Sequence, residues 1–143
     1  PWHPRELDAR LRRRSDQGEL NMTDREPPVI EFHEGEPPTE LVIEDLIVGD
    51  GAEAVAGAKV LVHYTGVDYA TGEEFDSSWG RGEPISFPLQ GLIAGWQEGI
   101  PGMKVGGRRE LIIPPRLAYG EAGGGHRLSG STLIFVIDLL AVS

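Results

Sequence analysis

The 143-residue chain contains no cysteine. This absence excludes disulfide bonds, thiolate nucleophiles and zinc sites built on cysteine ligands. A long hydrophobic run is also missing, because the longest apolar stretch covers only residues 133–137, whereas a bilayer-spanning helix needs roughly 20 apolar residues. No apolar core of signal-peptide type lies near the amino end. We therefore expect a cytoplasmic protein without a membrane span.

Basic residues are scarce. The 13 Lys and Arg residues are outnumbered by 23 Asp and Glu, which gives a formal net charge of −10. Proteins that bind nucleic acid through its phosphates need a basic surface, so the sequence argues against a nucleic-acid partner. The neighbouring pair Arg108-Arg109 is too small to supply such a surface. We predict that both side chains lie solvated on the face of a sheet.

Glycine and proline are abundant but unevenly distributed. Residues 1–38 hold 6 of the 11 prolines and only 2 of the 20 glycines, and they show almost no apolar periodicity. Such a segment buries too little apolar surface to offset its ordering entropy, so we expect a disordered tail. Met22 is a plausible native start, which would make residues 1–21 a remnant of upstream translation or cloning. Residues 39–143 are then a single domain.

Short β-rich runs separated by glycine turns dominate this domain. We expect five strands, and one short helix that ends at a glycine. The expected strands are residues 41–48, 59–67, 85–89, 108–113 and 132–142, and the expected helix is residues 92–99. Pro84 and Pro88 place the third strand at an edge or a bulge. The predicted fold class is α+β, with a curved antiparallel sheet wrapped around the helix.

Motifs for covalent or metal catalysis are absent from the sequence. The four histidines, at positions 3, 33, 63 and 126, do not have the spacing of metal ligands. Ser77 and Ser78 follow Asp76, but nothing marks a histidine as their partner base. A capped turn explains the two serines well, and Asp76 can both cap that turn and serve a pocket. We expect no metal, no cofactor and no serine nucleophile.

Aromatic residues cluster at strand ends and beside glycine turns. For Phe87 and Phe135 an ordinary core position is the better interpretation. Tyr64, Trp96 and Tyr119 carry a polar group that needs a partner, and each lies beside a turn where a pocket can open. These three residues therefore favour a binding pocket.

Six short motifs follow one another along the domain. They are Val62-His63-Tyr64-Thr65-Gly66, Gly72-x-x-Phe75-Asp76-Ser77-Ser78, Ile93-x-Gly95-Trp96-x-Glu98-Gly99, Met103-x-Val105-Gly106-x-Arg108, Ala118-Tyr119-Gly120 and Thr132-Leu133-x-Phe135. In order and spacing they closely resemble those of the FKBP-type peptidyl-prolyl cis-trans isomerases. The match spans residues 41–142 and points to a small single-domain member of bacterial type. The resemblance implies a five-stranded curved sheet around one helix, with the active site between them.

The resemblance also implies a set of site residues. Trp96 would form the pocket floor, and Arg81 would pair with Asp76, which has a positioning and electrostatic role rather than that of a general base. Tyr119 O–H and the backbone N–H of Ile93 would donate hydrogen bonds to substrate carbonyls. The implied catalytic set is Tyr64, Phe75, Asp76, Trp96, Tyr119 and Phe135, and the implied substrate- or inhibitor-binding set is Arg81, Ile85, Phe87, Leu92, Ile93 and Leu128.

The loop after Tyr119 departs from the family pattern. Residues 123–130 read Gly-Gly-Gly-His-Arg-Leu-Ser-Gly, where the family usually has an apolar Ile-Pro-Pro stretch. A glycine-rich polar loop makes the pocket rim more mobile and more polar. We expect weaker contact with rapamycin-type macrolide inhibitors, with Leu128 supplying the missing apolar group.

Two functions remain open at this point. The resemblance implies a monomeric, cofactor-free enzyme that accelerates rotation about X-Pro bonds in polypeptides and assists folding. The alternative is a non-catalytic interaction module that binds Pro-containing partner segments in the same pocket.

Overall fold

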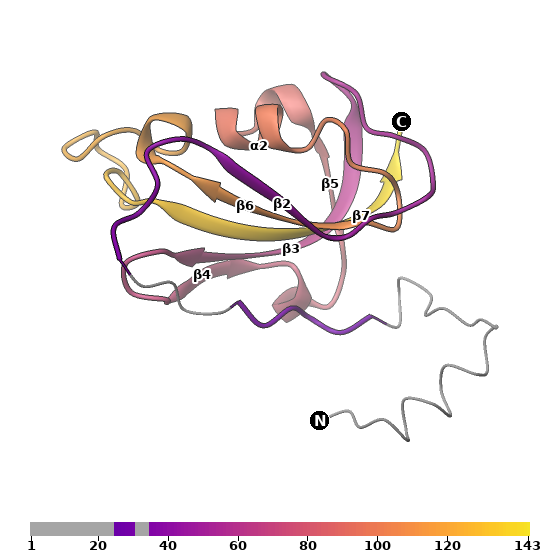
Figure 1. Cartoon of the computed structure of the whole chain (residues 1–143), viewed down its shortest axis with the longest axis horizontal. Helices are drawn as coiled ribbons and strands as arrows, with labels where there is room; N and C mark the ends of the chain where they lie inside the picture. Colours follow the sequence, from indigo (N-terminus) through magenta and orange to yellow (C-terminus); the bar gives the residue numbers. More distant parts are fainter. Residues whose placement is uncertain (1–24, 31–34) are drawn as a thin grey trace.

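The computed structural model describes residues 25–30 and 35–143. Its centre is a curved antiparallel sheet that packs against one short helix (Figure 1). The elements are β2 (Val42–Ile47), β3 (Lys59–Asp68), β4 (Glu74–Ser77), β5 (Ile85–Pro88), α2 (Ala94–Gly99), β6 (Arg108–Ile113) and β7 (Leu133–Val142). The strand order is β2-β6-β7-β3-β4, and β5 also pairs with β3. The predicted α+β class and antiparallel sheet are confirmed.

The sheet has one strand more than the five predicted. Both β4 and β5 pair with β3, at Thr65↔Ser77 and at Val62↔Ile85, so they follow one another along the same edge. The chain between them leaves the sheet in a 3-10 turn, η2 (Trp79–Arg81). Strand β4 has one apolar residue, Phe75, and so shows no alternation, whereas the equally short β5 alternates at Ile85 and Phe87.

Helix α2 lies close to the sheet because two of its residues are glycines. A Cβ atom on Gly95 would lie 2.5 Å from Cγ2 of Ile113, and one on Gly99 would lie 2.7 Å from Cδ2 of Leu111. Both distances are too short for a methyl group. The two glycines therefore let the helix approach β6, and this approach buries Trp96, which lies between them, to 4% exposure.

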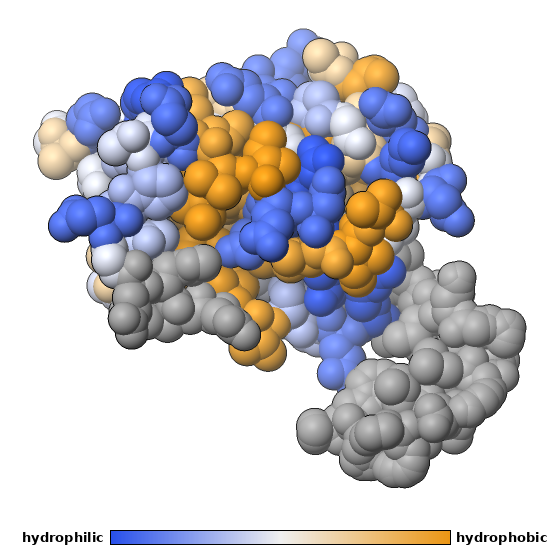
Figure 2. Space-filling view, viewed as in Figure 1, coloured by the Kyte–Doolittle hydropathy of each residue, from blue (hydrophilic) through white to orange (hydrophobic). Residues whose placement is uncertain are grey.

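The opposite edge of the sheet carries apolar side chains on its surface. Strand β2 pairs only with β6 among the described strands, and four of its six residues are exposed large hydrophobics. Figure 2 shows apolar and hydrophilic side chains interspersed across this face of the molecule. The exposed apolar side chains of β2 are Val42, Ile43, Leu46 and Ile47.

The predicted solvated pair Arg108-Arg109 is not solvated. Arg109 is 9% exposed, and it donates to Asp45 Oδ1 over 2.7 Å and to the carbonyl of Gly99 over 2.8 Å. Arg108 donates to Asp138 Oδ1 over 2.8 Å. The prediction was wrong because neighbouring strands and the end of α2 supply acceptors that no local pattern reveals.

The segment 25–30 contacts the sheet. Nη1 of Arg25 lies 2.9 Å from Oδ2 of Asp138, whose side chain is fully buried, and Arg108 donates to the carbonyl of Glu26. Two guanidinium groups thus neutralise one buried carboxylate, as a buried charge requires.

The disordered tail over residues 1–38 stays a prediction, and these contacts involve the described residues 25 and 26 within it. Closer to the domain, the Tyr69 hydroxyl also donates to the carbonyl of Glu36, over 3.4 Å. The expectations for residues 1–24 and 31–34, including the remnant at residues 1–21, lie outside the described residues. Within the described part of the chain, no helix is long and apolar enough to cross a membrane.

Candidate active site

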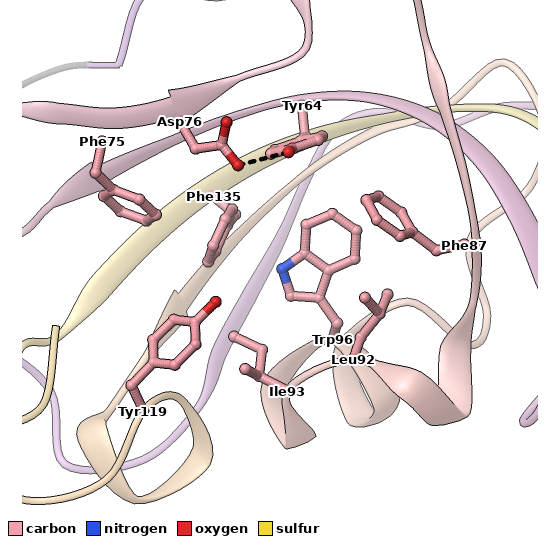
Figure 3. Close-up of a pocket in the computed structure, with 9 residues that line it drawn as sticks. All are labelled: Tyr64, Phe75, Asp76, Phe87, Leu92, Ile93, Trp96, Tyr119 and Phe135. Atoms are coloured by element: carbon pink, nitrogen blue, oxygen red, sulfur yellow. Dashed lines mark hydrogen bonds between the residues drawn. The ribbon is translucent and has the colours of Figure 1, made fainter. Parts of the chain in front are cut away.

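A pocket of about 190 Å³ opens between the sheet and α2. Strands β3, β4, β5 and β7 supply its aromatic walls, and the chain entering α2 supplies two aliphatic side chains (Figure 3). The lining residues are Tyr64, Phe75, Asp76, Phe87, Leu92, Ile93, Trp96, Tyr119 and Phe135. Nine of the twelve residues named from the sequence are therefore brought together.

Trp96 lies at the centre of the aromatic residues. Its ring meets Tyr64, Phe87 and Phe135 edge to face, with centroid separations of 5.4, 5.8 and 5.3 Å. Phe135 meets Phe75 in the same way at 5.5 Å. Each edge-to-face pair adds about 0.5–1.5 kcal/mol beyond area burial, so the rings support one another in a fixed apolar wall.

A polar cluster of Tyr64, Asp76 and Arg81 borders this wall. The Tyr64 hydroxyl donates to Asp76 Oδ2 over 2.6 Å, and Arg81 Nη1 donates to Asp76 Oδ1 over 2.9 Å. Arg81 Nη2 donates to the Tyr64 hydroxyl oxygen over 2.9 Å. Each member of the polar cluster therefore contacts the other two, and the predicted pairing of Arg81 with Asp76 is present.

The polar cluster holds its members in their ordinary charge states. Burial alone would raise the pKa of Asp76, but the hydrogen bonds from Tyr64 and Arg81 and the arginine charge bring it below its usual value. Burial raises the pKa of Tyr64, and the hydrogen bond to Asp76 raises it further. At neutral pH Asp76 is thus ionised and Tyr64 protonated. Neither group is poised to transfer a proton.

Two hydrogen-bond donors at the pocket are free. Among the described residues, no acceptor engages the Tyr119 hydroxyl or the backbone N–H of Ile93. Figure 3 shows the Tyr119 hydroxyl directed toward the pocket. Ile93 has extended backbone angles and precedes α2, so its N–H lies outside the helix. These donors can hold a carbonyl oxygen of a bound chain.

Three residues named from the sequence do not line the pocket. Arg81 acts on it only through the polar cluster, and Ile85 packs against the core from β5. Leu128, expected at the rim, is 7% exposed and belongs to the core. The loop that carries Leu128 folds back on itself, because Gly130 N–H donates to the carbonyl of Gly120 and Leu128 N–H donates to His126 Nδ1. In this folded loop the Leu128 side chain points into the core.

Two residues beside the pocket were missed by the sequence reasoning. His126 stacks on the ring of Tyr119 with centroids 4.1 Å apart and planes 12° from parallel. Ser78 hydrogen-bonds to the backbone of Tyr64, beyond the capped turn expected there. The departure of the loop at residues 123–130 from the family pattern indicated the region of His126, but it did not predict that His126 stacks on Tyr119. Within the described residues, no cluster of side chains is suited to a metal ion.

Comparisons with known proteins show the family of the chain. The family described as FKBP-type peptidyl-prolyl cis-trans isomerase matches residues 51–140. The chain is 66% identical over 116 residues to a probable FK506-binding protein of Corynebacterium glutamicum, covering 81% of this chain and 98% of that protein. It is 58% identical over 121 residues to an FK506-binding protein of Streptomyces anulatus, covering 82% and 98%.

Two solved structures have the same fold. FkpA from Escherichia coli superposes with a TM-score of 0.66 at 45% identity, covering 72% of this chain and 48% of that one. AtFKBP13 superposes with a TM-score of 0.64 at 40% identity, covering 75% of this chain and 96% of that one. The chain belongs to the FKBP-type peptidyl-prolyl cis-trans isomerase family.

Proposed function

We propose that the pocket accelerates rotation about X-Pro bonds of protein substrates by desolvating the bond and stabilising its twisted form. The observation that carries this proposal is the combination of an aromatic pocket with a polar cluster whose groups are not poised for proton transfer. Asp76 and Tyr64 are therefore not suited to general acid-base chemistry. The apolar pocket can still bind the twisted form of an X-Pro bond better than the planar form.

The physical reason lies in the amide bond. Rotation costs about 18–20 kcal/mol because the planar form is stabilised by resonance that separates charge. Water stabilises that charge separation, and an apolar pocket withdraws the water. Placing the proline ring against Trp96 therefore disfavours the planar form relative to the twisted one. Each 1.36 kcal/mol of this difference gives about a tenfold rate increase.

The free donors complete the proposal. Tyr119 O–H and Ile93 N–H would hold carbonyl oxygens on either side of the rotating bond, so that one end of the substrate is fixed while the other turns. Asp76 and Arg81 would position the Tyr64 ring and provide a fixed field at the pocket edge. No covalent step and no cofactor are needed. Cytoplasmic location and a monomeric state stay predictions.

Related proteins are named for FK506 binding, and we extend that ligand class to this pocket. Macrolides of the FK506 and rapamycin type would occupy the same aromatic surface. At the pocket rim their contact would be weaker than with an apolar loop, since Leu128 lies in the core and the side chain stacked on Tyr119 is His126.

A protease-coupled assay on a Leu-Pro peptide tests the proposal. We expect acceleration of cis-to-trans conversion at micromolar protein, and a strong loss of it in Trp96→Leu. The non-catalytic alternative predicts a different outcome, in which the same peptide binds in the pocket but its isomerisation rate is unchanged.

A further inference from the structure

Ser78 stands where β4 ends and η2 begins, and it is fully buried. Its N–H donates to the carbonyl of Tyr64 over 2.9 Å, which continues the pairing of β3 with β4. Its own carbonyl does not return to β3 but accepts from Arg81 N–H over 3.1 Å, because the backbone has turned to φ −73° and ψ −27°. The chain leaves the sheet at this residue.

This turn removes the carbonyl that would otherwise accept from Tyr64 N–H. The Ser78 hydroxyl takes its place, since Tyr64 N–H donates to Oγ over 2.7 Å. A buried amide without an acceptor would cost about 1–3 kcal/mol. The side chain of Ser78 therefore lets the strand end while β3 keeps its hydrogen bond.

His63 holds the hydroxyl in this orientation. Its Nδ1 lies 2.8 Å from Ser78 Oγ, and its ring stacks on Trp79 with centroids 3.9 Å apart. Burial lowers the pKa of His63, although the charge of Asp138 acts in the opposite direction, and this favours the neutral ring. Because Oγ already accepts from Tyr64, its own proton is available to a neutral Nδ1.

Ser78 is thus bonded to two members of the polar cluster, Tyr64 and Arg81, and stands two residues from the third. We propose that Ser78, held by His63, is a positioning residue of the active site. Its hydrogen bonds fix the η2 turn relative to β3, so that the Arg81 guanidinium reaches both Asp76 and the Tyr64 hydroxyl. This inference rests on the proposed function of the pocket.

The test compares Ser78→Ala with Ser77→Ala. Among the described residues, the Ser77 hydroxyl hydrogen-bonds only to the Thr65 hydroxyl, at 3.4 Å, so its removal is the matched control. We expect Ser78→Ala to lower kcat/KM by about three- to tenfold, in the range of couplings between contacting residues. The control should keep the wild-type value. A folded Ser78→Ala variant with unchanged kcat/KM would overturn the inference.

A double-mutant cycle separates positioning from general destabilisation. If Ser78 acts through Arg81, Ser78→Ala changes kcat/KM by less than about twofold in an Arg81→Leu background. The same loss of kcat/KM in both backgrounds would overturn the inference.

Should Ser78→Ala fail to fold, His63 provides a second pair of variants. His63→Leu should lower kcat/KM, and His63→Asn, whose amide oxygen can accept from Ser78, should restore most of it; no difference between the two would contradict the role of His63.

The affinity for a Leu-Pro peptide distinguishes this inference from the proposed function. If the wild-type protein binds the peptide without accelerating its isomerisation, the proposed function fails. The positioning role is then measured by peptide affinity alone. We expect Ser78→Ala to weaken peptide binding in the otherwise wild-type protein but not in the Arg81→Leu variant. Equal affinities of the wild-type protein and the Ser78→Ala variant would overturn the positioning role.

Discussion

The Tyr64 hydroxyl donates to Oδ2 of Asp76 over 2.6 Å, and this bond joins the apolar wall of the pocket to its charged edge. Tyr64 is 6% exposed and packs edge to face on Trp96, whereas the Asp76 side chain is 40% exposed. The tyrosine therefore shares in both halves of the site. A substitution at the charged edge should therefore alter the apolar wall of the pocket, and a substitution in the wall should alter the charged edge.

Tyr64→Phe keeps the ring and removes two hydrogen bonds, the one that the hydroxyl donates to Asp76 and the one that it accepts from Arg81. We expect kcat/KM for a Leu-Pro peptide to fall by at least about fivefold, the factor given by a loss of roughly 1 kcal/mol for each hydrogen bond. Tyr69→Phe is the matched control, because Tyr69 does not line the pocket and its hydroxyl reaches Glu36 instead. Equal losses in the two variants would refute a specific role for the Tyr64 hydroxyl.

The buried His63 should make stability fall in mild acid. Because burial lowers its pKa in the folded protein below the ordinary 6.5, the unfolded chain binds more protons over the interval between the two values. Stability then decreases as the pH falls below 6.5 toward the folded pKa. The Asp76 contribution is lost only at lower pH, below 3.8.

Urea unfolding of the wild-type protein and His63→Asn checks this expectation. The free energy of unfolding of the wild type should decrease more steeply between about pH 7 and about pH 5 than that of the variant. Parallel pH profiles would show that His63 does not titrate in this window.

Gly95→Ala tests how α2 is held. The added Cβ would lie 2.5 Å from Ile113, so the helix must move away from β6, at a cost of about 1–3 kcal/mol. A lower Tm and a shift in the tryptophan fluorescence of the protein should follow. Gly91→Ala is the control, since among the described residues outside its chain neighbours its Cβ would meet only Pro88, at 3.7 Å. The cost should shrink in an Ile113→Val background, and an undiminished cost would argue against this contact.

The polar loop should limit macrolide binding. Exchange of residues 123–127 for a proline-containing apolar segment, with Leu128 left in the core, should tighten FK506 binding by about tenfold, equivalent to 1.4 kcal/mol. Isothermal titration measures the change, and Arg127→Ala in the natural loop controls for loss of charge alone. Unchanged affinity after the exchange would mean that the loop does not contact the ligand.

Much of the fold was accessible from the sequence because the elements carry local signals. The alternation in β3, the prolines before and at the end of β5 and the glycine at the end of α2 each reflect a short-range constraint. Trp96 was predicted at the pocket floor because its motif resembles that of the FKBP-type family, and the structure adds that Gly95 and Gly99 let the helix approach the sheet.

What the sequence did not reveal depends on contacts between distant segments. Arg109 is buried because Asp45, 64 residues away, and the end of α2 supply its acceptors. Leu128 lies in the core because its loop closes on itself. Asp138 receives Arg25 from a segment whose composition predicted disorder. None of these partners can be read from spacing or composition.

The central claim is catalysis by an apolar pocket without proton transfer. NMR exchange spectroscopy of a Leu-Pro peptide, with catalytic amounts of protein in H₂O and in D₂O, tests it most directly. We predict exchange between cis and trans signals well above that of the peptide alone, at nearly equal rates in the two solvents. Exchange no faster than in the free peptide, or a severalfold slower rate in D₂O, would contradict the account.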